Sequence, residues 1–396
     1  MKKKVLIVDK SFAVGGIQTA LINMVKELKD TYDITVLMFN NDGVLKNRFP
    51  DDVKIIEPCY LMKLHGMSIG DAKKKLATYI LKAVTGACDR VFTNAFSIWF
   101  ALMFQKKLTG YDVAIAFHHE DSPKASISGF YRFVATKTDA PVKLGWIHYD
   151  PRFVSYDDTK NRKYMKKMNR LVCVSKGTAD NFIKCHPMFE NKVEYCYNFQ
   201  DIDRILELSS NDEKIVPCKG EFMCFSACRL TSQKAIPRAI RAFAPVLHQH
   251  QDVKWYIAGD GNERAECEQL IKQENLINQI VLLGAIDNPY PYMKSCDLYI
   301  QPSIYEAAPM VYGEALICQC PIFTTENISS SEMVDNKYGV ICENSENGLR
   351  TGLSSLLSNR GMITEMRNNL KTYQYTNDIC HEQIKKLTRG KNECQE

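Results

Sequence analysis

Short apolar runs rich in β-branched residues recur along the chain, with helical patterns between them. The first run, Lys4–Asp9, leads to a glycine pair at Gly15-Gly16, and residues 19–28 then carry apolar side chains at helical spacing. A second run follows at Ile34–Phe39. A strand, a loop, a helix and a strand in this order are typical of a doubly wound parallel sheet. Further strands of this series are expected at Val113–Phe117, Val142–Ile147 and Arg170–Val174.

A second series of apolar runs follows a polar stretch around residues 208–219. Its strands are expected at Phe222–Ala227, Lys254–Ala258, Ile280–Leu283, Leu298–Gln301 and Pro321–Thr324. Helical patterns lie between them at residues 236–248, 263–274 and 311–318. A chain of 396 residues is too long for one typical core, so two domains are expected.

These patterns predict an α/β fold with two Rossmann-like, doubly wound parallel-sheet domains that face a cleft. The expected boundaries are an N-terminal domain over 1–197, a linker over 198–220 and a C-terminal domain over 221–370. Residues 371–396 are expected to form a C-terminal helical segment, for which a return to the N-terminal domain is one option.

Composition favours an ordinary cytoplasmic protein. The fifteen cysteines include no Cys-x-x-Cys pair, and the apolar run after Met1 is too short for a signal-peptide core. Free, mostly buried thiols are therefore expected. No run approaches the ~18 to 20 apolar residues that span a bilayer. Neither a nucleic-acid partner nor an essential metal is expected, and the Asp201-Ile202-Asp203 sequence is interpreted as a helix cap.

Basic residues concentrate in the first half, where residues 1–197 contain 31 lysines and arginines against 20 acidic residues. One cluster consists of Lys160, Arg162, Lys163, Lys166, Lys167 and Arg170, and another is Lys73-Lys74-Lys75. Apolar side chains also recur at helical spacing at Phe92, Phe96, Trp99 and Met103. These features suggest docking on an anionic membrane surface, with the protein peripheral on the inner face of the cell membrane. The alternative is a stripe packed in the core and a solvated lysine-rich helix.

Candidate ligand-binding residues follow the expected strands, because open parallel sheets bind ligands at the carboxyl ends of their strands. Gly15 and Gly16 would let a ligand approach the backbone before a helix. Arg229 and Lys234 would clamp a diphosphate after the first strand of the second series. Glu306 precedes a helix expected to start near Pro309. Glu314 lies inside this apolar helix and needs a partner, such as ribose hydroxyls.

Together these elements resemble the retaining GT-B glycosyltransferases, the large family that includes bacterial capsule, lipopolysaccharide and teichoic-acid sugar transferases. The resemblance covers nearly the whole chain and is strongest from Phe225 to Val340. It rests on an Arg-x4-Lys element at 229–234, a Glu-x7-Glu element at 306–314, and the segments Ile257-Ala258-Gly259-Asp260-Gly261, Leu283-Gly284 and Asp297-Leu298-Tyr299-Ile300-Gln301-Pro302-Ser303.

The resemblance implies roles for these residues. Arg229 and Lys234 would hold the donor diphosphate, Glu314 would bind the ribose, and Glu306 would face the transferred sugar. Backbone groups of the segment that includes Ala308, Pro309 and Met310 would contact the donor, and the 283–288 loop with Gly284 would hold the base. On the acceptor side, the resemblance implies an active-site residue at His119 or Glu120, and the adjacent His118 is the alternative to His119. It also implies a Trp-x-His-x-Asp element that contains His148 and Asp150.

The chain departs from the family pattern where glycine is usual. Cys228 precedes Arg229, Ala235 follows Lys234, Ala307 follows Glu306, and Gln319 replaces the glycine of a Cys-Gly-x-Pro element. All the charged groups remain in place.

The resemblance implies transfer of a hexose-type sugar from a nucleotide diphosphate donor, with a UDP-sugar favoured, to a glycan or lipid-linked acceptor. The reaction would proceed with retention in cell-surface polysaccharide synthesis, and no cofactor is expected. The alternatives are a catalytically weak nucleotide-sugar-binding partner subunit of another transferase, a GT-B nucleotide-sugar epimerase or a glycan phosphorylase. A nicotinamide dehydrogenase is disfavoured because the G-x-G-x-x-G element is lacking.

Overall fold

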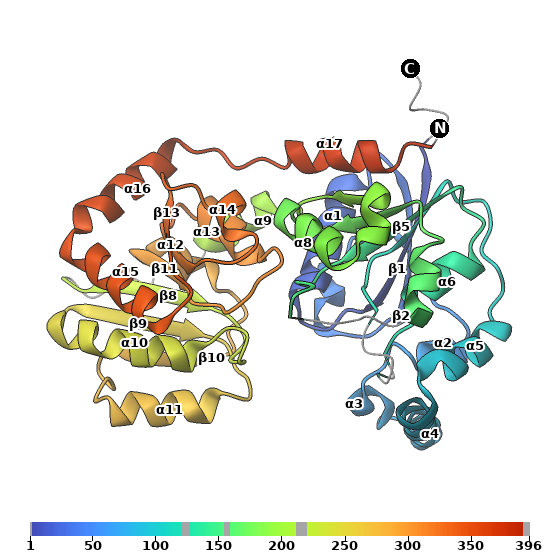
Figure 1. The fold of residues 1–396 in the computed structure, drawn as a ribbon, viewed down its shortest axis with the longest axis horizontal. Helices are drawn as coiled ribbons and strands as arrows, with labels where there is room; N and C mark the ends of the chain where they lie inside the picture. Colours follow the sequence, from blue (N-terminus) through green and yellow to red (C-terminus); the bar gives the residue numbers. More distant parts are fainter. Residues whose placement is uncertain (1, 121–124, 126, 154–158, 211–219, 391–396) are drawn as a thin grey trace. The chain divides into compact units, whose positions relative to one another are not determined.

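The structure, a computed structural model, describes residues 2–120, 125, 127–153, 159–210 and 220–390. It divides into two compact units, of which unit 1 comprises Met1–Phe199 and Asn377–Glu396 and unit 2 comprises Gln200–Thr376. Each unit has one parallel sheet with helices packed against it (Figure 1). The expected α/β class with two Rossmann-like domains is confirmed.

Within its described residues, unit 1 has a seven-stranded parallel sheet in the order β3-β2-β1-β4-β5-β6-β7. The strands are Lys4–Ser11 (β1), Asp33–Asn40 (β2), Lys54–Ile56 (β3), Val113–Ala116 (β4), Val142–Ile147 (β5), Arg170–Cys173 (β6) and Val193–Tyr195 (β7). The helices are Gly16–Leu28 (α1), Tyr60–Lys63 (α2), Ile69–Ala72 (α3), Leu76–Phe92 (α4), Asn94–Met103 (α5), Phe130–Lys137 (α6), Thr159–Met165 (α7), Lys176–Cys185 (α8) and Asp378–Leu387 (α17), with 3₁₀ turns at Val44–Arg48 (η1) and Pro187–Lys192 (η2).

Unit 2 has a six-stranded parallel sheet among its described residues, in the order β10-β9-β8-β11-β12-β13. The strands are Phe222–Ala227 (β8), Val253–Ala258 (β9), Ile280–Gly284 (β10), Leu298–Gln301 (β11), Ile322–Thr325 (β12) and Gly339–Cys342 (β13). The helices are Ile202–Ser210 (α9), Ile236–Gln249 (α10), Arg264–Gln273 (α11), Tyr290–Ser295 (α12), Met310–Ile317 (α13), Ser330–Met333 (α14), Glu346–Ser358 (α15) and Arg360–Thr372 (α16).

The strand order creates a switch point in each sheet. In both units the chain first adds strands on one side of the first strand and then crosses to its other side. The change of direction falls between β1 and β4 in unit 1 and between β8 and β11 in unit 2. Loops diverge at such a point, so the carboxyl edge there is where open α/β sheets bind ligands.

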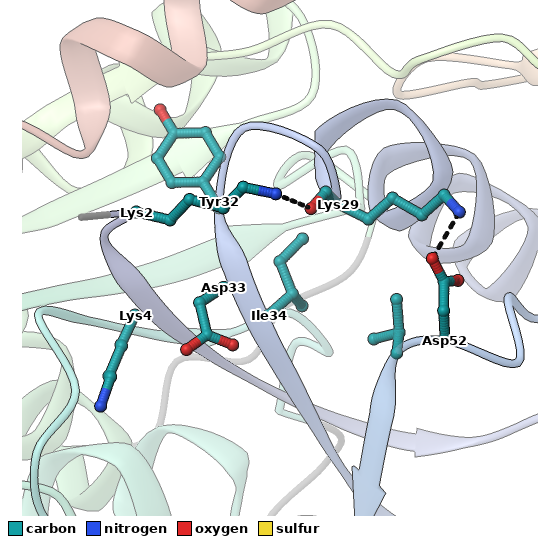
Figure 2. A pocket seen from close by; sticks show the side chains of 8 residues that line it. Lys2, Lys4, Lys29, Tyr32, Asp33, Ile34 and Asp52 are labelled. Carbon is teal, nitrogen blue, oxygen red and sulfur yellow. Dashed lines mark hydrogen bonds and ion pairs between the residues drawn. The ribbon is translucent and has the colours of Figure 1, made fainter.

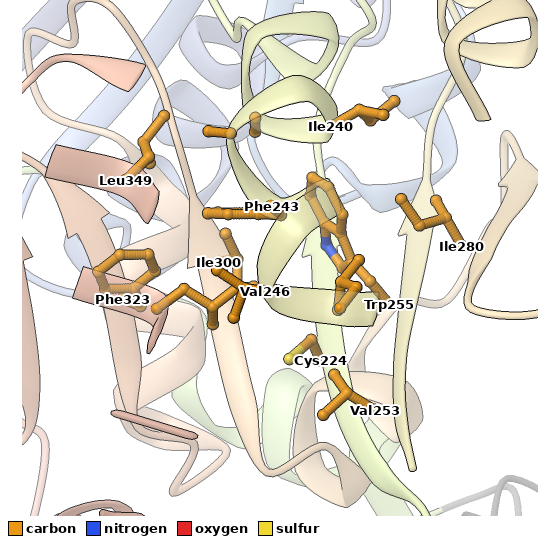
Figure 3. Packing of buried hydrophobic residues seen from close by; sticks show 14 of the residues in the cluster. Cys224, Ile240, Phe243, Val246, Val253, Trp255, Ile280, Ile300, Phe323 and Leu349 are labelled. Carbon is orange, nitrogen blue, oxygen red and sulfur yellow. The ribbon is translucent and has the colours of Figure 1, made fainter. Parts of the chain in front are cut away.

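Burial on both faces explains the continuous apolar strands. Residues 5–9 of β1 are all buried, as a central parallel strand with helices on each side requires. In unit 2, α10 covers the sheet with one apolar face, where Ile240, Phe243 and Val246 pack towards Trp255 of β9 (Figure 3). The Trp255 indole N–H donates to Ser226 Oγ over 2.9 Å, so its polar atom is satisfied inside this core.

Several elements were not expected from the sequence. β3, β7 and β13 have only three or four residues each and lie at sheet edges. The segment expected as a linker contains α9, which belongs to unit 2. By contrast, α17 lies in the expected C-terminal helical segment and belongs to unit 1, the return that was one option. Pro309 is the N-cap of α13, so the helix begins at Met310, one position after the expected start.

Two of the departures from family glycines fall where the backbone is left-handed. Ala235 has a φ of 54° and caps α10, and Gln319 has a φ of 57° after the last turn of α13. Side chains with a Cβ are disfavoured in this conformation, which explains why glycine suits both positions. Gln319 is exposed, so its side chain makes no core packing that glycine would remove.

Replacing Gln319 with glycine is therefore expected to stabilise the protein by about 0.5–1 kcal/mol. A residue with a Cβ costs about 1–2 kcal/mol in the left-handed conformation, and glycine removes this cost. Glycine also gives the unfolded chain more conformational freedom, which offsets about 0.4–1 kcal/mol of that gain. Urea unfolding measures the change. Gln273, an exposed residue in the last turn of α11, is the control, and Gln273→Gly should destabilise by about 0.5–1 kcal/mol. Equal losses in both variants would contradict the strain argument.

Candidate functional site

The loops that follow β8 and β11 meet at the switch point of unit 2. The two strands pair in parallel, with Leu298 opposite Cys224 and Tyr299 opposite Phe225. Arg229 and Lys234 follow β8, and Glu306 follows β11, so all three lie at one carboxyl edge. The backbone N–H of Ile304 donates to the carbonyl of Gln233 over 2.8 Å and ties the loops together.

Glu306 is the most enclosed of these charged groups, with 5% of its surface exposed. Its Oε1 accepts hydrogen bonds from the Lys234 ammonium, from Ser303 Oγ at 2.7 Å and from Gln301 Nε2 at 3.0 Å. Its Oε2 accepts a longer bond of 3.5 Å from Gln233 Nε2. A buried carboxylate needs such a cation and donors, and the arrangement fixes the direction of its second oxygen.

A network of buried polar side chains lies next to this carboxylate. Gln301 Oε1 accepts from the Tyr299 hydroxyl at 3.1 Å, and Gln301 Nε2 donates to Ser303 Oγ at 2.8 Å. The backbone carbonyls of the same segment accept from Thr324 Oγ1 and Thr325 Oγ1. Because these side chains are buried and hydrogen-bonded, the network holds Glu306 in one orientation.

The Arg229 loop rests on the loop that follows β9. The backbone N–H of Cys228 donates to Ala258 O and that of Leu230 to Asp260 O, both at 3.0 Å. A Cβ on Gly259 would lie 1.8 Å from Cys228 O, and one on Gly261 would lie 2.2 Å from Leu230 O. The glycines thus allow the close approach that positions the Arg229 loop. Arg229 itself is exposed, and no ion pair joins it to another described residue.

The remaining donor-side residues surround the start of α13. Ala308 and Pro309 lead into this helix, whose first turn begins at Met310 and leaves backbone N–H groups without helical acceptors. Glu314 lies in the next turn, and the Tyr290 hydroxyl donates to its Oε1 over 3.4 Å. Gly284 ends β10 with a φ of 75°, and its carbonyl accepts from Gly259 N–H at 2.7 Å.

Burial is the main cause that raises the pKa of Tyr299 well above its usual range, and the Glu314 charge adds to it. Glu314 therefore lies near the network that holds Glu306.

Unit 1 gathers three histidines at the corresponding edge of its own sheet. His118 and His119 follow β4, and His148 follows β5. The His118 and His119 rings stack with centroids 5.1 Å apart, and His118 Nδ1 lies 3.1 Å from Asp9 Oδ1 at the end of β1. His148 Nε2 lies 2.9 Å from the carbonyl of Phe117, so its neutral ring donates there.

Burial lowers the pKa of His148 and of His119. It is the main cause that lowers the pKa of His148 to about 3, and the neighbouring His118 adds to it. The pKa of His119 is also lowered well below its usual range, by burial and by repulsion from His118 and His148. Both rings are therefore neutral at pH 7, and either can accept or donate a hydrogen bond.

Acid is expected to destabilise the protein through these histidines. Their pKa values are lower in the folded chain than in the unfolded one, so the unfolded chain takes up protons first as the pH falls. The contribution of these neutral histidines to the free energy of unfolding should be fully present above about pH 6.5 and should fall towards pH 3. For His148 the loss should be up to about 1.4 kcal/mol per pH unit. Urea unfolding between pH 7 and 4 measures this. His148→Gln should flatten the slope, and an unchanged slope would contradict the assignment.

Glu120 and Asp150 are both bound to neighbouring structure. Glu120 accepts from Ser128 Oγ, from Gly129 N–H at 2.6 Å and from Tyr131 N–H at 2.8 Å, so both of its oxygens cap the start of α6. Asp150 pairs with the Arg152 guanidinium, with a closest distance of 2.8 Å. These contacts favour structural roles for both carboxylates, and their predicted active-site roles gain no support from this geometry.

The glycine pair lies at the start of α1. This helix begins at Gly16, and Thr19 N–H donates to Gly15 O over 3.0 Å. A Cβ on Gly16 would meet no atom within 4 Å, whereas one on Gly15 would lie 2.6 Å from Gln18 Oε1. The helix N-terminus thus faces the same carboxyl edge as the histidines, because β1 and β4 pair in parallel.

A pocket of about 380 Å³ lies elsewhere in unit 1 (Figure 2). Lys4 and Asp33, at the amino-terminal starts of β1 and β2, line it, together with the Lys29–Asp52 ion pair of 2.7 Å. Parallel sheets bind ligands at the opposite edge, so we do not assign this pocket to the predicted site.

No role was predicted for Gln301, Ser303, Gly259 or Gly261, although all four fall in segments that carry the family resemblance. The signal for Gln301 was a polar residue at the end of a buried apolar strand, which needs a buried partner. No group of three histidine, cysteine, aspartate or glutamate side chains in the described ranges is placed to hold a metal ion. Metal-free chemistry remains a prediction.

The chain is similar in sequence to known glycosyltransferases. Residues 209–377 match the family model "Glycosyl transferases group 1". An N-acetylgalactosamine-N,N'-diacetylbacillosaminyl-diphospho-undecaprenol 4-alpha-N-acetylgalactosaminyltransferase of Campylobacter jejuni is 30% identical over 201 residues, covering 50% of this chain and 53% of its own. An uncharacterized glycosyltransferase of Methanocaldococcus jannaschii is 28% identical, covering 45% and 49%. The matches thus span about half the length of these relatives.

Solved structures match the fold over nearly the whole chain. HepE of Anabaena in complex with UDP and glucose has a TM-score of 0.65 at 18% identity and covers 99% of both chains. TarM has a TM-score of 0.68 at 16% identity and covers 98% of this chain and 99% of its own. The fold is therefore GT-B, with two Rossmann-like domains.

Proposed function

We propose that the chain is a glycosyltransferase that moves a hexose-type sugar from a nucleotide diphosphate donor, a UDP-sugar by preference, to a glycan or lipid-linked acceptor. The observation that carries the proposal is the Lys234–Glu306 pair at the switch point of unit 2, beside the exposed Arg229. This edge offers a diphosphate two cations and a sugar one fixed carboxylate.

Arg229 and Lys234 would stabilise the charge that develops on the departing diphosphate. The ammonium has three donors, so it can bind a phosphate oxygen while one donor remains on Glu306. The N–H groups at the start of α13 would add a favourable dipole. All these groups are held before the reaction begins, which limits the reorganisation that the transition state requires.

The two carboxylates would contact different parts of the donor. Glu306 Oε2, which has the weaker of the contacts described above, would face the transferred sugar. Glu314 would bind the ribose hydroxyls, and Gly284 would border the base. His119 of unit 1, neutral at pH 7, would contact the acceptor or the sugar by a hydrogen bond. Transfer with retention, in which the donor phosphate takes the acceptor proton, follows from the family resemblance.

The named relatives support the choice of substrates. HepE and a TarM variant were each crystallised with UDP, and the name of the Campylobacter relative includes a diphospho-undecaprenol acceptor. A role in cell-surface polysaccharide synthesis is part of the proposal for the same reason.

Calorimetric titration with UDP, GDP and ADP tests the donor site. UDP should bind the wild type, and Arg229→Ala should weaken binding by about 10- to 100-fold, because a hydrogen bond to a charged group contributes about 1.5–3 kcal/mol. Glu314→Gln should also weaken binding. Arg350→Ala, which removes an exposed cation of α15, is the control and should bind like the wild type. Undiminished binding in Arg229→Ala, or no binding of any of the three, would refute the assignment.

A further inference from the structure

Helix α4 carries its apolar side chains outward and its polar side chains inward. Its buried residues are Thr78, Lys82 and Asp89, which recur at helical spacing on one face. On the outside, Leu76 is 75% exposed and Val84 is 56% exposed. A helix on a water-soluble body normally has the opposite pattern, so the outer face of α4 suits a different environment.

Polar contacts attach α4 to the rest of unit 1. The Lys82 ammonium donates to Leu64 O over 2.6 Å, and the Thr78 hydroxyl lies 2.7 Å from that of Tyr60. The Asp89 carboxylate accepts from Ser97 Oγ of α5. Burial lowers the pKa of Lys82 to about 8. The inner face is therefore committed to the body, which leaves the apolar face outermost.

Helix α5 continues the same apolar surface after a break at Thr93. Its core side is formed by Ile98, Ala101 and Leu102, whereas Phe96, Trp99 and Met103 are each more than half exposed. Figure 1 shows α3, α4 and α5 gathered at one end of unit 1, beyond the strands. The stripe expected from the sequence is therefore not core packing. Together, the exposed apolar residues of α4 and α5 form the apolar surface referred to below.

The charges around this surface are mostly positive, although the exposed Asp42 pairs with Lys74 over 3.6 Å. Lys73 and Lys75 precede α4, Lys106 and Lys107 follow α5, and all four are exposed. The acidic residues of 60–110 are Asp71, which caps α3, and Asp89, which is buried. A second copy of the chain would bring lysines against lysines around this surface, whereas anionic lipid headgroups would neutralise them.

The apolar surface lies at the carboxyl edge of the unit 1 sheet. Asn40, the last residue of β2, donates to Asp71 over 3.4 Å. Lys10, near the end of β1, is close enough for its charge to lower the pKa of both Lys82 and His119. The surface and the histidine cluster therefore belong to the same end of this unit.

We propose that this apolar surface inserts into the headgroup region of an anionic bilayer, with its lysines on the lipid phosphates. The proposal rests on the proposed function in one respect, since a lipid-linked acceptor would then be presented at the edge that carries His119. The cluster around Lys160 is a separate feature. Its Arg170 donates to Leu387 O over 2.8 Å and so anchors α17, and the side chain of Lys160 lies outside the described residues.

Tryptophan fluorescence of the full chain tests the insertion. The chain has three tryptophans, of which Trp146 and Trp255 are buried and Trp99 is on the apolar surface. Vesicles of phosphatidylglycerol and phosphatidylcholine should shift the emission to shorter wavelength at low salt, and lipids brominated on the acyl chain should quench it. Trp99→Phe should lose the shift and still sediment with vesicles, and added salt should release the protein.

A double substitution, Phe96→Ser with Phe100→Ser, should lower the partition into vesicles at least about tenfold. The control pair, Met188→Ser with Ile277→Ser, removes comparably exposed apolar side chains elsewhere and should bind like the wild type. Absent sedimentation with anionic vesicles, equal binding of both doubles, or self-association through this surface would overturn the proposal. Titration with UDP separates the two proposals, because a chain that binds UDP but no vesicles contradicts only this one.

Discussion

Replacing Lys234 with alanine is expected to lower kcat/KM by about 10²- to 10³-fold. The loss has two parts: the diphosphate loses a preorganised cation, and Glu306 loses the ion pair that fixes its direction. Removing one such electrostatic partner from an active site typically costs about 2.7–4 kcal/mol of transition-state stabilisation. Steady-state kinetics with a nucleotide-sugar donor measures the change.

The same substitution should also destabilise the fold, by up to about 3–5 kcal/mol, since it leaves Glu306 charged and 5% exposed. This second effect allows the two roles to be separated. Glu306→Gln in the Lys234→Ala background removes the uncompensated charge and should recover much of the stability, while activity should stay low. If activity returns together with stability, the pair is structural and its catalytic assignment is wrong.

Replacing Gly259 with alanine is expected to have the second largest effect. Its φ of 136° disfavours a Cβ, and that Cβ would lie 1.8 Å from Cys228 O. Backbone strain costs about 1–3 kcal/mol and overpacking about 1–3 kcal/mol, so a total loss of about 2–6 kcal/mol is expected. Because the clash falls on the residue before Arg229, affinity for UDP should fall as well.

Gly86→Ala supplies the control for this substitution. Gly86 lies within α4 and a Cβ there would meet no atom within 4 Å, so alanine should stabilise the helix by about 0.5–1 kcal/mol. Urea unfolding and calorimetry on both variants provide the comparison. A Gly259→Ala protein with wild-type stability and wild-type UDP affinity would show that the close approach of the two loops does not position Arg229.

The sequence predicted the two parallel sheets because buried parallel strands have a distinct sequence pattern. Runs such as Val5–Val8 are apolar at every position, and each is followed by a helical pattern or a turn. The strands that were missed, β3, β7 and β13, are short edge strands with half-buried side chains. Three or four residues of this kind carry no period that separates a strand from a loop.

The site was predictable where a residue's neighbours are set by topology and not where they are set by local packing. Arg229, Lys234 and Glu306 follow adjacent strands, so their convergence followed from the strand order. Glu120 was equally close to a strand end, but its carboxylate turns to the start of α6, which only the loop geometry determines. The polar inner face of α4 was hidden for the same reason, since sequence spacing gives two faces without saying which one is buried.

The proposed function requires that this edge of unit 2 performs sugar transfer and does not merely bind a nucleotide sugar. The most direct measurement follows a UDP-sugar by proton NMR with the wild type and with Glu306→Gln, in the presence of candidate glycan and lipid-linked acceptors. We predict that the wild type releases UDP and forms a product with the anomeric configuration of the donor, while Glu306→Gln is at least about tenfold slower. Tight UDP binding with equal, background-level release in both proteins would contradict sugar transfer and identify a nucleotide-sugar-binding subunit.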